Sequence, residues 1–214
     1  VFEHFCGGVN EEDCLTVVDK MYTKGKVSSV LDYSVEGKEE ESQFDAALAM
    51  TLKTIEFAKE REAIPFAVFK PTGFGRINLY EKVGEQAELS GAEQDEWQRV
   101  INRFDTACKA AFEKDVLLLI DAEESWMQDA ADAIVTDMMR KYNQQKAIVF
   151  NTLQLYRWDR LDYLKQLHEQ AKIEGFYIGM KLVRGAYMEK ENKRAEEKKY
   201  VSPPQSDTAD KTGT

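Results

Sequence analysis

Short apolar runs alternate with longer amphipathic segments along most of this chain. Five runs are rich in Val, Ile, Leu or Phe and are nearly continuous rather than alternating. Such continuous apolar runs are typical of strands that are buried on both faces, as in a parallel sheet. The five predicted strands are Val27–Tyr33, Phe66–Thr72, Val116–Ala122, Ala147–Gln154 and Tyr177–Arg184.

Helical patterns lie between these runs. Their apolar residues recur at helical spacing, and charged residues fill the remaining positions. The predicted helices are Glu39–Glu62, Gln94–Lys114, Trp126–Tyr142, Asp159–Glu174 and a highly charged one at Met188–Lys199. Gly175 stands where the fourth of them should end. This order predicts an α/β protein, because repeated strand–helix units demand parallel strands joined by right-handed crossovers.

Two architectures satisfy this order, an open doubly wound sheet and a (β/α)₈ barrel. A full barrel takes about 250 residues. The 214 residues of this chain supply five clear strand–helix units and a leading segment. The pattern of elements alone therefore leaves both architectures open.

Polar side chains at the strand ends favour the barrel. The βα loops of a barrel converge on one mouth, whereas an open sheet concentrates its site at one switch point. Here all five predicted strands contribute polar groups. They are Asp32 and Tyr33, then Lys70 and Thr72, then Asp121, Glu123 and Glu124, then Asn151, Thr152 and Gln154, and finally Lys181 and Arg184.

These strand-end residues differ in how readily a structural role explains them. Lys70 and Asp121 follow apolar residues, so each must find a buried partner or point into the mouth, which favours a functional role. Asn151 is interpreted as a cap of the next helix. Glu123 and Glu124 are interpreted as carboxylates of a first helical turn, where the helix dipole favours them.

Composition excludes several classes of protein. Lys and Arg total 29 against 39 Asp and Glu, a net charge of −10, which opposes binding to nucleic acid. No apolar run approaches the roughly 20 residues of a membrane-spanning helix. Three cysteines and two histidines predict neither a disulfide framework nor a metal site. The stretch GFGR, Gly73–Arg76, lacks both the G-x-G-x-x-G spacing and a helix start, so nucleotide-binding signals are weak.

Four of the strand-end stretches, read together, resemble the proline dehydrogenase family of FAD-dependent enzymes. LVRGAY followed by an acidic residue is the most specific of them, and IDAEE supports it. LDYSVEG, residues 31–37, also looks like the opening strand of single-function members. The four stretches are FAVFKPTGFGR (Phe66–Arg76), LLIDAEESW (Leu118–Trp126), FNTLQLY (Phe150–Tyr156) and KLVRGAYMEKE (Lys181–Glu191). The resemblance runs from about Phe2 to Val201.

The resemblance implies a distorted (β/α)₈ barrel with FAD across its C-terminal mouth. It implies that Lys70 and Asp121 lie beside the substrate and the flavin, and that Tyr187 lines the proline pocket. It also implies that Gln154 bonds the flavin ring and that Lys181 lies near the reactive nitrogen of the flavin. The remaining implied cofactor-binding residues are Val183, Arg184, Gly185 and Ala186.

The implied reaction is the oxidation of L-proline to pyrroline-5-carboxylate by hydride transfer to FAD. The resemblance also implies that the electrons pass to a membrane quinone and that contact with the bilayer is at most peripheral. It places the protein in the bacterial cytoplasm or, in a eukaryote, on the matrix side of the mitochondrial membrane.

After the fifth predicted strand, this chain departs from the pattern of the family. Residues 1–214 are expected to form one incomplete barrel domain, with a loop or disordered tail at 201–214. The last three strands and an arginine pair that grips the substrate carboxylate are expected in a missing portion. We therefore expect the 214-residue chain to be catalytically impaired. Two alternatives stay open, an inactive barrel fragment and a barrel enzyme that forms a Schiff base on Lys70 or Lys181.

Overall fold

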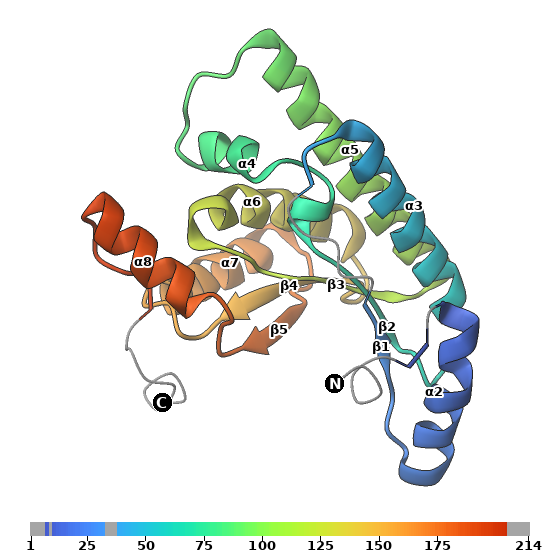
Figure 1. The fold of residues 1–214 in the computed structure, drawn as a ribbon. Helices are drawn as coiled ribbons and strands as arrows, with labels where there is room; N and C mark the ends of the chain where they lie inside the picture. Colours follow the sequence, from blue (N-terminus) through green and yellow to red (C-terminus); the bar gives the residue numbers. More distant parts are fainter. Residues whose placement is uncertain (1–6, 9, 33–37, 205–214) are drawn as a thin grey trace.

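Five parallel strands form one sheet in the order β1-β2-β3-β4-β5 in the computed structural model (Figure 1). The structure describes residues 7–8, 10–32 and 38–204. The strands are β1 Val30–Leu31, β2 Phe66–Phe69, β3 Leu117–Ile120, β4 Val149–Gln154 and β5 Met180–Val183. In a doubly wound sheet the strand order reverses at a switch point, and this sequential order contains no such reversal. The order therefore indicates the barrel-type arrangement and not the doubly wound sheet.

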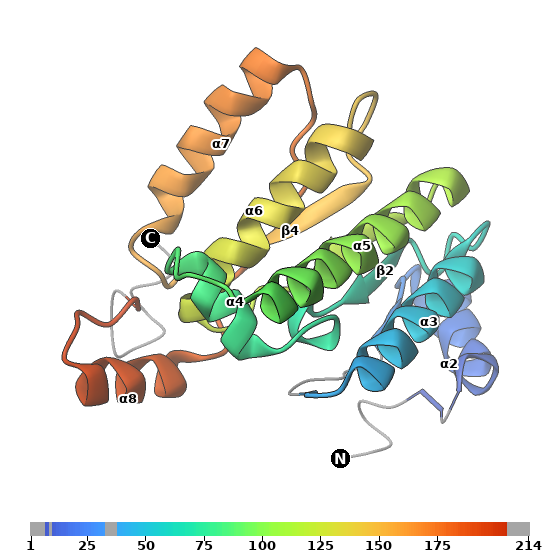
Figure 2. The same cartoon turned by 90° about the horizontal axis from the view of Figure 1, so that it is seen from above.

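Helices α3, α5, α6 and α7 cover one face of the sheet (Figure 2). The helices in chain order are α2 Glu11–Gly25, α3 Glu41–Ala58, α4 Ile77–Gly84, α5 Gly91–Lys114, α6 Ser125–Tyr142, α7 Arg160–Glu174 and α8 Met188–Lys198. This one-sided cover is what a barrel requires, because the opposite face is its interior.

The hydrophobic core lies between the sheet and these helices. Phe69 of β2 stacks on Phe74 with ring centroids 4.3 Å apart, and Phe104 of α5 packs edge-on against both rings. Leu118 and Ile120 of β3 are almost completely buried in the same cluster. Because alternate strand residues point to opposite faces, the intervening residues of each strand face the interior.

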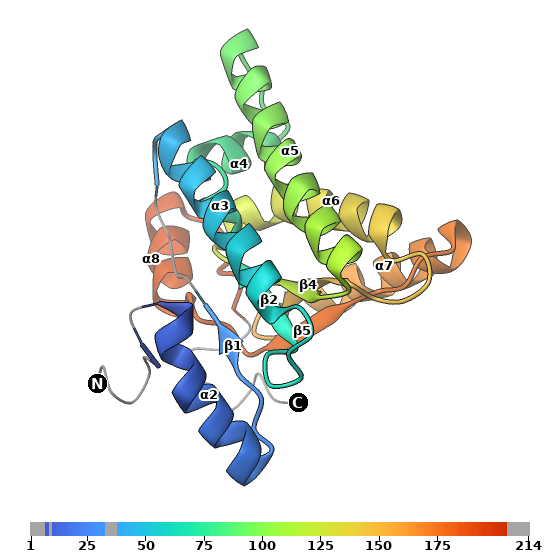
Figure 3. The ribbon, with the colours of Figure 1, turned by 90° about the vertical axis from the view of Figure 1, so that its right-hand side faces the viewer.

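Two helices were not among the predicted elements. Helix α2 lies beside β1 (Figure 3), and its Tyr22 hydroxyl donates to Glu62 at 2.9 Å, near the start of β2. Helix α4 begins at Ile77, directly after Gly73–Arg76. The expectation that GFGR lacks a helix start is therefore wrong. The helix was missed because its eight residues are too few to establish a periodicity.

The predicted strands overrun the observed ones because their last residues leave the sheet. After Phe69, Pro71 has no N–H to donate and starts a 3-10 turn, Pro71–Gly73. Of Val27–Tyr33 only Val30 and Leu31 pair, and Tyr33 lies outside the described residues. The predicted end of α7 is confirmed, since Gly175 adopts a left-handed φ of 78°.

The described strands form an open part of a barrel. Strands β1 and β5 are its two edges within the described ranges, and Leu182 of β5 is 62% exposed. The LDYSVEG stretch falls mostly on undescribed residues 33–37, and residues 205–214 of the predicted tail are also outside the description. The single-domain boundary and the tail stay predictions.

Candidate functional site

The predicted site residues on the strands share the interior face of the sheet. In β2 and β3, Phe69 and Ile120 pair and point into the core, so the next residues, Lys70 and Asp121, point the other way. In β4 and β5, Gln154 pairs with Val183 on this same interior side. The sheet thus collects side chains from four strands at its C-terminal edge.

Asp121 lies between two lysine side chains. Its Oδ1 accepts a hydrogen bond from Lys181 Nζ at 2.5 Å, and its Oδ2 lies 3.5 Å from Lys70 Nζ. The side chains of Asp121 and Lys70 are only 15% and 14% exposed, and that of Lys181 is 33% exposed. Partial burial strengthens these charge–charge contacts relative to a surface pair. The three residues form one cluster with an excess of positive charge.

Glu123 is a buried carboxylate directly beside this cluster in the chain. It is 2% exposed and accepts hydrogen bonds from the Thr72 amide at 2.8 Å and the Thr72 hydroxyl at 2.7 Å. Burial raises the pKa of Glu123 to about 7, against the opposing effect of the Thr72 hydrogen bonds. Its interpretation as a first-turn carboxylate is wrong, because it ties the end of β2 to the end of β3.

Gln154 ends β4 with one side-chain atom bonded and one not. Its Nε2 donates to the carbonyl oxygen of Glu123 at 2.8 Å. The residue is 1% exposed, and among the described residues its Oε1 has no hydrogen-bond partner. A buried acceptor without a donor is costly unless a ligand supplies one.

The residues after β5 are held by the loop that follows β4. The amides of Leu155 and Tyr156 donate to the carbonyls of Val183 and Arg184, each at 2.8 Å. Gly185 has a φ of +132°, and a Cβ there would lie 1.8 Å from Cδ1 of Tyr156. Only glycine fits this position, so contact with the tyrosine ring explains it without a ligand.

Tyr187 lies at the start of α8, and two residues of the segment before it are exposed to solvent. Tyr187 is the N-cap of α8, and the Lys190 ammonium lies 5.2 Å from the centre of its ring. The Arg184 and Ala186 side chains are exposed. The structure therefore joins Lys70, Asp121 and Lys181 directly, whereas the places of Arg184, Ala186 and Tyr187 in a common site stay predictions.

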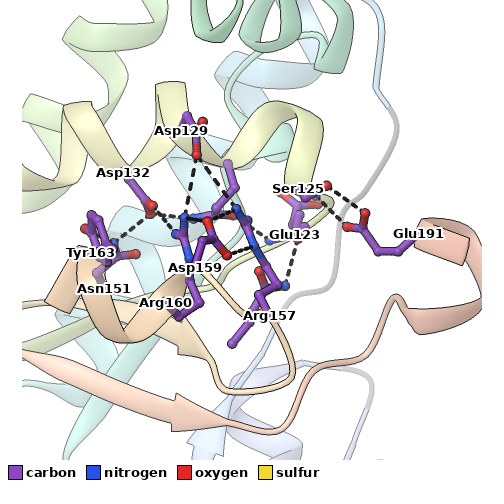
Figure 4. Close-up of polar contacts among 12 residues, drawn as sticks. Glu123, Ser125, Asp129, Asp132, Asn151, Arg157, Asp159, Arg160, Tyr163 and Glu191 are labelled. Atoms are coloured by element: carbon purple, nitrogen blue, oxygen red, sulfur yellow. Dashed lines mark hydrogen bonds and ion pairs between the residues drawn. The ribbon is translucent and has the colours of Figure 1, made fainter. Parts of the chain in front are cut away.

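A second polar network lies on the helix side of β4 (Figure 4). Asp132 of α6 is buried and accepts hydrogen bonds from Asn151 at 2.9 Å and Arg160 at 2.7 Å. Asn151 also donates to the Tyr163 hydroxyl at 3.1 Å. The interpretation of Asn151 as a helix cap is wrong, since it joins β4 to α6 and α7. Its position in the middle of the strand gave no signal of these distant partners.

Within the described ranges no helix is long and apolar enough to span a bilayer. The described residues also contain no group of three or more His, Cys, Asp or Glu side chains that could hold a metal ion.

The fold and the cluster define a class of protein. A parallel β/α sheet of barrel type gathers a partly buried carboxylate and two ammonium groups at the C-terminal ends of its strands, where barrel enzymes carry their sites. A sequence profile of proline dehydrogenases matches residues 14–212. The chain belongs to the proline dehydrogenase family.

Individual relatives agree with this assignment. The chain is 35% identical over 189 residues to the carbapenem antibiotics biosynthesis protein CarD of Pectobacterium carotovorum subsp. carotovorum, covering 88% of this chain and 50% of CarD. It is 43% identical over 117 residues to the mitochondrial proline dehydrogenase 1 of Drosophila melanogaster, covering 55% of this chain and 17% of that protein. The chain spans about half or less of the curated relatives it matches.

Solved structures share the fold. Proline utilization A (PutA) from Bdellovibrio bacteriovorus, inactivated by N-propargylglycine, superposes with a TM-score of 0.80 at 18% identity, over 96% of this chain and 22% of that one. PutA from Corynebacterium freiburgense gives a TM-score of 0.75 at 17% identity, over 98% and 21%. At this identity the likeness establishes the α/β barrel-type fold alone.

Proposed function

We propose that this chain carries the barrel of an FAD-dependent proline dehydrogenase, which oxidises L-proline to pyrroline-5-carboxylate. The observation that carries the proposal is the cluster in which Asp121 lies between Lys70 and Lys181. Family membership supports the reaction, and the cluster supplies charged groups at the strand ends where that reaction needs them.

The residues beside this cluster fit a flavin. The unpartnered Oε1 of Gln154 is an acceptor that a ring N–H can satisfy, and the Lys181 ammonium can balance negative charge. When bound, FAD would accept the hydride that leaves the ring carbon beside the proline nitrogen. The segment from Val183 to Ala186 would hold the cofactor through its backbone and side chains.

The chain's own groups have separate roles in this proposal. Lys181 provides a fixed positive charge, and charge that is in place before the reaction stabilises a transition state at no cost of reorganisation. Asp121 holds both ammonium groups in position, so neither lysine must be ordered during the reaction. Tyr187 would line the proline pocket from the start of α8.

The electron acceptor and the compartment are also part of the proposal. We infer that the electrons pass to a membrane quinone, with at most peripheral contact between protein and bilayer. Several eukaryotic relatives are named as mitochondrial. In a eukaryotic cell we therefore expect the matrix side of the mitochondrial membrane, and in a bacterium the cytoplasm.

A Schiff-base enzyme explains the cluster less well. The attacking lysine of such an enzyme needs its amine free to meet a carbonyl, whereas Lys181 Nζ is bonded to an Asp121 carboxylate oxygen at 2.5 Å. Lys70 faces the same carboxylate. Borohydride trapping with a carbonyl substrate would detect a Schiff base and would contradict the flavin proposal.

An inactive fragment is the second candidate, and the open sheet edge favours it. The 62% exposure of Leu182 leaves apolar surface on β5 uncovered within the described residues. An open parallel edge of this kind is an aggregation hazard. A chain in this state would be colourless and unable to retain FAD.

One absorption experiment separates these candidates. The purified chain is mixed with FAD, freed of unbound FAD and titrated anaerobically with L-proline. A retained flavin band that bleaches with proline supports the proposal. A retained band that proline leaves unchanged rejects the substrate, and a colourless protein favours the fragment. A parallel titration with 4-hydroxyproline tests whether a ring-substituted substrate is accepted as well.

A further inference from the structure

The first turn of α8 is fastened to the start of α6 by a buried carboxylate. Glu191 of α8 is 0% exposed. It accepts hydrogen bonds from the amide and the hydroxyl of Ser125, both at 2.6 Å (Figure 4). Sixty-six positions of sequence separate the two residues. Burial of a carboxyl group at this depth is costly unless such hydrogen-bond donors meet it.

Glu191 takes the place of the missing cap of α6. The N-cap residue of α6, Glu124, forms no side-chain cap bond of its own. The first amides of a helix need an acceptor, and the positive end of the helix dipole favours a negative one. Glu191 meets both needs from another helix, so the start of α6 and the first turn of α8 stabilise each other.

A second contact runs in the opposite direction between the same segments. Lys190 Nζ donates to Glu124 Oε1 at 2.7 Å, and the Glu124 side chain is 8% exposed. Adjacent residues of α8, Lys190 and Glu191, therefore hold adjacent residues of the β3–α6 junction, Glu124 and Ser125. We call these four residues the α8 clamp.

The clamp reaches Tyr187 through the backbone of α8. The Glu191 amide donates to the Tyr187 carbonyl at 2.9 Å, which is the first hydrogen bond of the helix. Tyr187 is the N-cap residue, and the Lys190 ammonium lies over its ring. The backbone position of Tyr187 is therefore tied to that of Glu191.

We propose that Glu191 is a positioning residue, which orients Tyr187 toward the substrate by fastening α8 to Ser125. This inference rests on the proposed function, because that function makes Tyr187 a wall of the proline pocket. The Glu191 carboxylate bonds Ser125 and not the charge cluster in the hydrogen bonds of the described residues, so the inferred effect is on substrate binding.

The test compares Glu191→Gln and Ser125→Ala with Glu196→Gln. Glu196 is exposed on the same helix, so its variant removes the same charge without touching the clamp. The readouts are amide hydrogen exchange of residues 187–198 and the KM and kcat of proline-dependent flavin bleaching. We expect the two clamp variants to accelerate exchange there and to raise KM about tenfold, with a smaller change in kcat, as loss of a charge-assisted hydrogen bond predicts.

The double variant supplies a further check. If Ser125 and Glu191 act as one unit, Ser125→Ala adds little to the effect of Glu191→Gln. If the fold-changes in KM of the two single variants instead multiply in the double variant, the two residues act independently and the proposal is overturned. Equal KM and exchange in Glu191→Gln and Glu196→Gln would overturn it as well.

Failure of the proposed function would look different. Without proline-dependent bleaching in the unaltered protein, the function is rejected, whereas exchange still reports on the clamp because it needs no cofactor. Faster exchange with unchanged KM would make the clamp merely structural and overturn the inference.

If Glu191→Gln loses protection throughout the chain, Lys190→Met tests the exposed half of the clamp. A smaller rise in KM supports the proposal, and an unchanged KM overturns it.

Discussion

Asp121 accepts a hydrogen bond from Lys181 at 2.5 Å across an intervening strand. Asp121 follows β3, Lys181 lies in β5, and β4 separates them. The pairings of Leu119 with Phe150 and of Thr152 with Lys181 bring Asp121, Thr152 and Lys181 to one level of the sheet. Neighbouring strands lie about 4.8 Å apart, so only a long side chain passing over a small one can close this distance.

Replacement of Lys181 tests the charge in this arrangement. In Lys181→Met the positive charge is lost while Asp121 keeps Lys70 as a partner, so folding should be little affected. We expect proline-dependent flavin reduction to slow by about 100-fold, the usual effect of removing one stabilising group. Anaerobic stopped-flow absorbance measures this rate. Lys181→Arg keeps the positive charge and should retain much of the rate of flavin reduction. Equal rates in Lys181→Met and the unaltered protein would contradict the proposed role of the Lys181 charge.

Replacement of Gln154 tests the unpartnered acceptor. Gln154→Leu keeps the size of the side chain and removes both Oε1 and the donor to Glu123. We expect the dissociation constant for FAD to rise about tenfold, as loss of one hydrogen bond to a ligand predicts. FAD titration followed by flavin fluorescence measures it. Gln98→Leu, on an exposed face of α5, is the matched control. Unchanged FAD affinity in Gln154→Leu would show that this acceptor does not meet the cofactor.

The strand-end residues could be predicted because the information is local. Lys70 and Asp121 each follow a run of apolar residues, and parallel strands bring their ends to one edge. Gln154 and Lys181 also belong to the predicted strand-end stretches. Pairing of Asp121 with both lysines could not be predicted, since it depends on the register between strands and not on any one stretch of sequence.

Residues whose partners lie far away in sequence were misread. Glu123 bonds Thr72 across 51 positions, and Asn151 bonds Asp132 across 19. Locally, an acidic pair before a helix and an asparagine in a strand both match common capping patterns. Tertiary contacts overrode these patterns, because a buried polar group must take whichever partner the fold brings to it.

Glu123 should make stability depend on pH. Its pKa is raised from 4.5 to about 7 in the folded protein, so its ionised form is less stable there than in the unfolded chain. Its contribution is therefore most favourable below pH 4.5 and is lost as the pH rises to about 7. The full loss amounts to about 3 kcal/mol.

Glu123→Gln should flatten this dependence. The amide is close in size to the carboxyl group and cannot ionise, and the Thr72 hydroxyl can turn to accept from it. Urea unfolding between pH 4.5 and 7 measures the slope of the unfolding free energy. Glu88→Gln removes an exposed carboxyl group and should leave the slope unchanged. An identical slope in Glu123→Gln and the unaltered protein would contradict the raised pKa.

Gly185 should tolerate no side chain, and Gly91 provides the comparison. At Gly185 the φ of +132° is strained for any other residue, and a Cβ would overlap the Tyr156 ring at 1.8 Å. At Gly91, the first residue of α5, a Cβ would meet no atom within 4 Å. Strain and overpacking together predict that Gly185→Ala lowers the free energy of unfolding by about 2–5 kcal/mol. Gly91→Ala should raise it by up to about 1 kcal/mol.

Chemical denaturation of the two alanine variants measures this difference, and flavin retention shows where the strain falls. Gly185 lies between the strand of Lys181 and the start of α8 at Tyr187. To relieve the overlap, either the Tyr156 ring or the backbone of this connection must move. Movement of the connection would displace Tyr187 and weaken both FAD and proline binding, whereas movement of the ring would lower stability alone. If Gly185→Ala is as stable as Gly91→Ala, the close contact with Tyr156 does not exist in solution.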